Sequence, residues 1–355
     1  MDMRKWAAAG AALLSFAGAA AAQQKITMTV AAGQPPAALL SLRLISTMFI
    51  PAVTKRLAEE KAGLTVEWRE AYAGSLLKPM QLMDGVKDGV AEIGYLPNIF
   101  HPDRLPLDLI TYVVPFTETD TVRVGKAMNK LHAALPEMGA QYTKFGLQRL
   151  AGSGVDSFQM VSTFPVKKFE DLKGHKIASA GGALLWLRGT GAVPVQSNMM
   201  EYYNSMRTGV YEATLVFAST FPAMKYPEVA PHVIKANFGA MYATSLVMNK
   251  GVFDKLPAAA KKIFMEEGER WGLEADRVYQ NAGEAGYKAL PAFKATVTEL
   301  PREEIAKWAK ALPNIAREWA DRMDKAGYPG SKALKMYMDE LRALGATPVR
   351  DWDKE

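Results

Sequence analysis

The stretch Asp171–Ala213 reads DLKGHKIASAGGALLWLRGTGAVPVQSNMMEYYNSMRTGVYEA. Its glycines and apolar spacing predict a turn at 171–174, a strand over 176–178, a helix over 183–189, an extended piece at 193–195 and a helix over 199–209. The apolar run at 214–217 predicts one more strand. Strands that alternate with helices are typical of an α/β fold, in which helices cover parallel strands.

The same alternation precedes and follows this stretch. We expect strands over 25–32, 64–69, 91–95, 159–162 and 295–300, and helices over 37–62 and near 80–86. From Leu256 to Ala289 the pattern is helical without a break, although it contains Gly268, Gly272, Gly283 and Gly286. No flexible linker divides the chain, so the order favours two α/β lobes that are joined by several crossovers.

Three short motifs carry a family resemblance. Asp171-Leu172-Lys173-Gly174 with Lys176-Ile177, then Ala192-Val193-Pro194-Val195, then Thr208-Gly209-Val210 resemble the DctP-like family, the periplasmic solute receptors of TRAP transporters. The resemblance covers residues 25–345. It implies a two-lobed periplasmic binding protein-like fold with mostly parallel sheets, covering helices, a ligand cleft between the lobes and a long helix spanning both. We assign 23–150 and 240–285 to lobe I, and 151–239 and 286–355 to lobe II.

The residue that should hold the ligand is missing. In the family, a DLKG-x-KIR strand supplies an arginine for the carboxylate of the substrate, and Ala178 stands in its place here. A second family arginine lies earlier in the chain, at a position near Phe158. One reading keeps an organic acid, an aromatic or other bulky monocarboxylate, whose charge would be held by the backbone N–H groups of Gly181-Gly182 at a helix start or by Arg188. The other reading is a neutral or cationic solute on aromatic faces, with Glu70 or Glu201 beside it.

Ligands of α/β folds collect beyond the carboxyl ends of the strands. Aromatic, amide and glycine residues lie in and beside the loops that we expect there. The predicted ligand-binding residues are Tyr72, Tyr95, Asn98, Phe158, Gly181, Gly182, Trp186, Arg188, Phe217 and Phe221.

The sequence offers little for catalysis. The four histidines are far apart, no Cys is present, and neither a Walker A loop nor a G-x-S-x-G turn occurs. We therefore predict no enzyme activity, no catalytic residue, no metal and no cofactor. The net charge of +6 is spread among acidic residues without a basic run, which argues against nucleic-acid binding.

The N-terminus has the order of a secretory signal peptide. Arg4 and Lys5 precede an Ala-rich apolar run that ends in small residues, so we expect cleavage near Ala22 and a periplasmic protein that does not itself span the membrane. The implied partners are a small solute and the membrane permease subunits of a TRAP transporter. An exported enzyme and a binding protein that serves a sensor stay open as alternatives.

Overall fold

The computed structural model describes residues 24–355. The expected signal peptide, residues 1–22, lies outside the described part. Within residues 24–355 we find no helix whose length and hydropathy would let it cross a bilayer.

Nine strands of the described chain form one mixed sheet in the order β2-β1-β3-β8-β4-β7-β5-β6, with β9 paired to β8. Their bounds are β1 Gln24–Ala32, β2 Leu64–Ala71, β3 Ile93–Pro97, β4 Leu147–Ser162, β5 Lys176–Ser179, β6 Val193–Gln196, β7 Ala213–Phe217, β8 His232–Asn249 and β9 Thr296–Glu299. The predicted strands are present, most of them within a few residues at each end. Strand β4, however, begins at Leu147 and not at the predicted residue 159, and β8 was not predicted.

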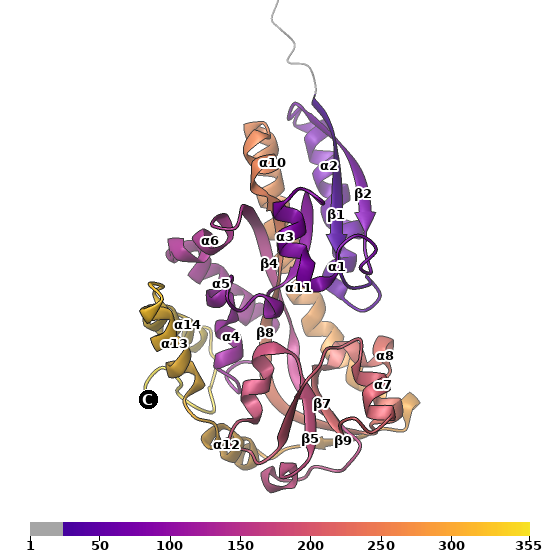
Figure 1. The fold of residues 1–355 in the computed structure, drawn as a ribbon, viewed down its shortest axis with the longest axis vertical. Helices are drawn as coiled ribbons and strands as arrows, with labels where there is room; N and C mark the ends of the chain where they lie inside the picture. The colour runs from indigo at the N-terminus through magenta and orange to yellow at the C-terminus, as the bar shows by residue number, and fades with distance from the viewer. Residues whose placement is uncertain (1–23) are drawn as a thin grey trace, which may run out of the picture.

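The long strands β4 and β8 connect the two lobes. They pair with each other in antiparallel orientation through most of their length, with several register shifts. β3 pairs with the end of β8 at residues 244–248, whereas β9 pairs with its beginning at 232–235. In Figure 1, β1 and β2 lie at one end of the molecule, β5 and β9 at the other, and β4 and β8 run between them.

The pairing at the two ends of the sheet is parallel, as the α/β pattern predicts. The connection between them is antiparallel, so the sheet is more mixed than the sequence suggested. Strands β4 and β8 are buried on both faces along almost their whole length, because helices cover them on either side. The predicted change of lobe near residue 240 falls inside β8 and stays a prediction.

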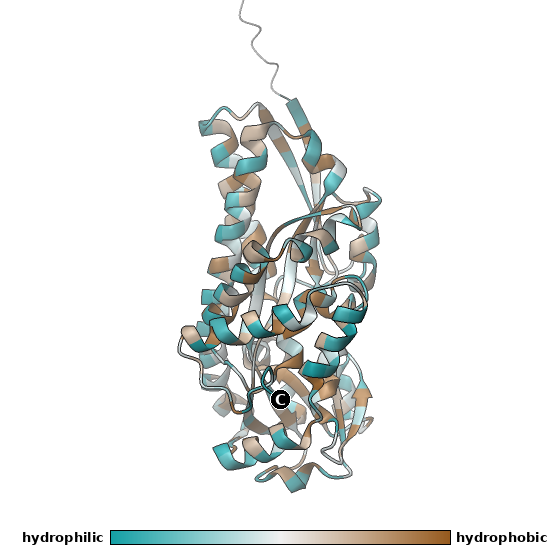
Figure 2. Cartoon of the chain, turned by 90° about the vertical axis from the view of Figure 1, so that its left-hand side faces the viewer, coloured by the Kyte–Doolittle hydropathy of each residue, from teal (hydrophilic) through white to brown (hydrophobic). Residues whose placement is uncertain are grey.

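Helices surround this sheet. Those of the N-terminal part are α1 Leu40–Leu44, α2 Ile50–Glu59, α3 Leu82–Lys87, α4 Ile110–Val113, α5 Thr121–Ala134 and α6 Pro136–Thr143. The remaining helices are α7 Tyr202–Arg207, α8 Phe221–Met224, α9 Tyr226–Val229, α10 Lys250–Lys255, α11 Ala258–Lys288, α12 Arg302–Ala311, α13 Ile315–Lys325 and α14 Gly330–Ala343. Figure 2 shows hydrophilic and hydrophobic residues alternating along the outer helices, the amphipathic pattern of helices that cover a core.

Helix α11, with 31 residues, is the long helix that the sequence predicted, and it packs against α1 and α2 in one lobe and α8 in the other. Its glycines allow a close approach to the sheet. A Cβ on Gly272 would lie 2.6 Å from the carbonyl oxygen of Gly152 in β4, and one on Gly286 would lie 2.0 Å from that of Ala218. The residues that weaken the helix in isolation therefore let it approach strand β4 and the segment after β7 closely.

The helix predicted over 37–62 is divided into α1, a π-helical turn Ile45–Phe49 and α2. Pro51 lies at the start of α2 and has no N–H for an i→i−4 bond, which interrupts the hydrogen-bond ladder at this place. At the C-terminus, α13 packs on α4, and α14 packs on α5.

Candidate functional site

A cavity of about 450 Å³ lies between the loops that follow the strands of the two lobes. From lobe I come the turn after β1, the segment before α3 and the residues that follow β3. From lobe II come β7 and the segments after β5 and β6, and the joining strands β4 and β8 complete the wall. Its lining comprises Gly33, Gln34, Leu39, Lys78, Pro79, Met80, Pro97, Ile99, Phe100, Tyr112, Val155, Phe158, Ala180, Asn198, Met199, Met200, Tyr202, Leu215, Val216, Phe217, Ala243 and Thr244.

Aromatic rings form one wall. Phe158 of β4 and Phe217 of β7 are paired across the two strands, and their ring centroids are 5.4 Å apart. Tyr112 meets Phe158 edge-on at 6.2 Å. Packing against one another fixes these rings in place, so the wall is a preformed apolar surface.

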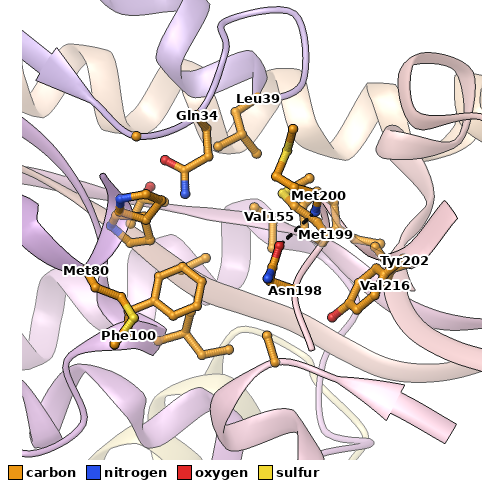
Figure 3. Close-up of a pocket in the computed structure, with 18 of the residues that line it drawn as sticks. Gln34, Leu39, Met80, Phe100, Val155, Asn198, Met199, Met200, Tyr202 and Val216 are labelled. Carbon is orange, nitrogen blue, oxygen red and sulfur yellow. Dashed lines mark hydrogen bonds between the residues drawn. The ribbon is translucent and has the colours of Figure 1, made fainter. Parts of the chain in front are cut away.

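Methionines and a further phenylalanine also line the cavity. Figure 3 shows Met80 and Phe100 at one side of the cavity and Met199 and Met200 at another. Met80 is 71% exposed and Met200 is 53% exposed, so each reaches from the cavity to the surface. Because methionine is flexible and polarisable, these residues can adapt to ligands of different shape.

Few polar groups reach into the cavity. The side chain of Gln34 points inward in Figure 3, and its Oε1 is buried without a hydrogen-bond partner among the described residues. Asn198 accepts a hydrogen bond from the Met200 N–H at 3.0 Å, which holds the turn after β6. Burial raises the pKa of Tyr202, so its phenol stays protonated and acts as a neutral hydrogen-bonding group.

The position of the family arginine lies inside the sheet. Ala178 is fully buried in β5, where it pairs with Val195 on one side and Thr214 on the other. Phe158, near the position of the second family arginine, contributes a ring to the wall. The interior end of the cavity therefore carries no guanidinium from either position.

Among residues 24–355, Lys78 is the charged side chain that lines the cavity. It is exposed, and no carboxylate of the described residues lies within 4.0 Å of its Nζ. Neither Glu70 nor Glu201 belongs to the lining: Glu70 accepts a hydrogen bond from Ser46, and Glu201 accepts one from the Ser197 hydroxyl at 3.1 Å.

Of the ten ligand-binding residues predicted from the sequence, Phe158 and Phe217 line the cavity. Asn98 is not among the lining residues, but its two neighbours in the chain, Pro97 and Ile99, are. Its side chain is fully buried, and neither its amide nitrogen nor its oxygen has a partner in the described part of the chain. An amide in this state is poised to bond with a ligand or a water.

Three further predicted residues support the lining from behind. Trp186 is fully buried, its ring stacks on Tyr112 at 6.0 Å, and its indole N–H donates to the Tyr112 carbonyl oxygen at 2.7 Å. Gly181 and Gly182 belong to a short 3₁₀ helix, Gly181–Leu187. A Cβ on Gly181 would lie 2.5 Å from Ile99, so this helix start is packed against lobe I.

The other four lie away from the lining. The Tyr95 hydroxyl shares a hydrogen bond with Ser41 at 2.7 Å, and Phe221 packs edge-on against Tyr287 at 6.2 Å. Tyr72 receives a hydrogen bond from Ser46 at 3.2 Å. Arg188 is bound by Glu318 through two contacts of 2.5 and 3.1 Å at the exposed surface.

Sequence reasoning missed Lys78, Met80, Tyr112 and Tyr202, among others. The segment after β6, which supplies Met199 and Met200, does obey the rule that ligands meet the carboxyl ends of strands, so the rule could have found it. Tyr112 belongs to the short helix α4 and has no local signal. Within residues 24–355, no cluster of three or more His, Asp or Glu side chains has the geometry of a metal site.

Comparison with known proteins places the chain in a family. The sequence profile of the bacterial extracellular solute-binding proteins, family 7 (DctP), matches residues 52–322. A curated solute-binding protein of Albidiferax ferrireducens is 31% identical over 173 residues, which is 44% of this chain and 47% of that protein. The match thus spans about half the length of this relative. A solute-binding protein of Verminephrobacter eiseniae is 24% identical over 279 residues, 76% of this chain and 79% of that protein.

Solved structures share the fold. A TRAP solute-binding protein from Rhodoferax ferrireducens, in complex with copurified benzoate, has a TM-score of 0.77 at 21% identity and covers 90% of this chain and 98% of its own. One from Bordetella bronchiseptica with bound (R)- and (S)-mandelate has a TM-score of 0.75 at 19% identity, with coverage of 90% and 99%. The likeness confirms the two-lobed architecture. With the profile match across residues 52–322, it follows that this chain belongs to the DctP family of bacterial extracellular solute-binding proteins.

Proposed function

We propose that this protein is the periplasmic solute receptor of a TRAP-type uptake transporter, and that it binds a bulky or aromatic monocarboxylate between its lobes without converting it. The observation that carries the proposal is the cavity of about 450 Å³, walled by rings and methionines, whose described lining includes one basic residue, Lys78, and no acidic residue. Such a site gains most of its binding free energy from apolar contact.

The sign of the ligand's charge follows from the lining. A cationic solute would need a carboxylate nearby, and Glu70 and Glu201 lie elsewhere. A dianion would leave one charge against apolar walls, which is unfavourable without a paired donor. A monoanion or a neutral molecule meets neither difficulty. The benzoate and mandelate bound by the structural neighbours are monocarboxylates that carry a ring. They support a monocarboxylate over a neutral molecule as the ligand of this chain.

Closure of the lobes would serve as the signal to the transporter. Strands β4 and β8 and helix α11 connect the lobes and provide the hinge about which they would rotate. Closing on the solute removes it from water and changes the surface that the permease subunits meet. We further propose export to the periplasm with cleavage near Ala22, and the division of the lobes at residues 150, 239 and 285.

A ligand screen tests the proposal. The purified protein is heated with small monocarboxylates, dicarboxylates, amines and polyols, and hits are measured by isothermal titration calorimetry. We expect stabilisation by ring-bearing monocarboxylates that grows as RT ln(1 + [L]/Kd). Stabilisation by amines alone would contradict the proposal that the ligand is a monocarboxylate. Disappearance of a bound acid over hours, followed by chromatography, would contradict a receptor without chemistry.

A further inference from the structure

The distribution of charge around the cavity sets the orientation of the ligand. Resting on the proposed function, we propose that the ligand is an amphiphilic monocarboxylate that binds with its apolar body inward and its carboxylate at the mouth, beside Lys78. Arylalkyl and alkyl carboxylates, in which the acid group lies at one end of a long apolar body, form this class.

The interior end of the cavity is unsuited to a carboxylate. There the wall is made by Phe158, Phe217 and Val216, and the backbone position of the family arginine is the buried Ala178. A carboxylate without charge-assisted donors in such surroundings loses its hydration with little in return. The neutral hydroxyls and amides nearby can satisfy an ether, a carbonyl or a hydroxyl of a ligand, but they provide no positive charge.

Lys78, by contrast, is positioned at the rim by its backbone. Its N–H donates to the Gln81 side chain at 3.0 Å, and the adjoining Pro79 lies directly on the turn after β1. A Cβ on Gly33 would fall 2.4 Å from the Pro79 nitrogen, so this turn admits the segment only because residue 33 is glycine. The ammonium group lies beside Gly74, where a Cβ would be 3.1 Å from Nζ, and it has no carboxylate within 4.0 Å among the described residues. It is therefore free to turn toward an incoming anion.

Two apolar side chains stand at the entrance of the cavity. Met80 and Met200 come from the two lobes, both line the cavity, and both remain more than half exposed. Exposed methionines next to a lysine suit a ligand whose chain continues from the interior to the mouth. A cavity of about 450 Å³ falls in the range of sites that hold drug-sized ligands, and it is larger than a single-ring acid needs.

A homologous series tests this orientation. Calorimetry is performed with ω-phenylalkanoates from phenylacetate to 8-phenyloctanoate and with the matching primary amides, using wild type, Lys78→Met, Lys78→Arg and the control Lys332→Met. Lys332 is an exposed lysine of α14 for which no ion pair is found in the described chain, so its removal changes the net charge equally.

We expect the affinity of the acids to rise by about fourfold per added methylene until the cavity is filled. Lys78→Met should weaken the acids at least tenfold and leave the amides unchanged, whereas Lys78→Arg should retain most of the affinity and Lys332→Met all of it. If Lys78→Met weakens acids and amides equally, or does not weaken the acids, the proposed orientation is wrong. The proposed function as a solute receptor would still stand. Binding of pyroglutamate with no member of the series bound would overturn the ligand class. If no acid of any kind binds, the proposed function fails as well.

Discussion

Replacement of Asp156 by Asn should remove a pH dependence of stability that arises in the joining strand β4. Asp156 lies in β4, is 5% exposed, and accepts hydrogen bonds from the Ser219 N–H at 3.0 Å and the Ser219 hydroxyl at 2.5 Å. Its carboxyl also contacts the position of Gly283 in α11. It therefore connects a joining strand, lobe II and the long helix at one point.

Burial raises the pKa of Asp156 from 3.8 to about 7, against the lowering effect of the Ser219 hydrogen bonds. The neighbouring phenols of Tyr279 and Tyr287 remain protonated because burial raises their pKa values. The native state thus binds a proton that the unfolded chain has released above pH 4. The free energy of unfolding falls by 1.36 kcal/mol per pH unit through this window, or by about 4 kcal/mol in all.

An asparagine has the same shape and does not ionise, although one of the two hydrogen bonds weakens at a cost of about 1 kcal/mol. The variant should be about 1 kcal/mol less stable than wild type at pH 4 and about 3 kcal/mol more stable at pH 8. Urea unfolding at half-unit steps of pH measures both curves. Parallel curves for wild type and variant would refute the reasoning, whereas Ser219→Ala should move the apparent pKa of Asp156 further upward.

Three substitutions and one control variant probe the site and the structure around it. Phe217→Ala removes a ring that lines the cavity and is 8% exposed, so we expect a loss of about 3–5 kcal/mol in urea unfolding and weaker binding of ring-bearing acids by calorimetry; unchanged binding would mean that this wall does not touch the ligand. Gly33→Ala should displace the Pro79 segment and lower ligand affinity at least tenfold, while Gly139→Ala, with open space at its Cβ, should raise stability by up to about 1 kcal/mol and leave affinity unaltered. Arg188→Ala breaks an exposed pair with Glu318, so binding should stay the same and stability should fall by less than about 1 kcal/mol; a tenfold loss of affinity would instead place Arg188 in the site.

The fold could be predicted largely because its periodic elements are local. β1 alternates in burial from Ile26 to Val30, and α11 repeats its apolar residues at helical spacing, so each shows its period in the sequence. The strand β8 does not: residues 238–248 are buried on both faces, and an apolar run without alternation fits a buried helix equally well. Its pairing with β4 joins residues that are 70 to 102 positions apart, and no local pattern indicates such a partner.

The prediction of the site was correct only for aromatic residues that belong to the strands lining the cavity. Phe158 and Phe217 end up in the lining because their strands pair across the middle of the sheet. Arg188 follows a helix start in the sequence, but the position of α13 brings Glu318 to it, and this contact depends on the packing of the C-terminal helices. Lys78 and Met80 precede α3, in a segment with no periodic pattern. They reach the cavity because Pro79, which lies between them, packs against Gly33.

A crystal structure with the acid that binds most tightly in the screen tests the central claim most directly. The account predicts that the acid lies between the lobes, with its apolar body against the rings of Phe158 and Phe217 and its carboxylate beside Lys78. An acid bound at another place on the protein, with this cavity holding only water, would contradict it.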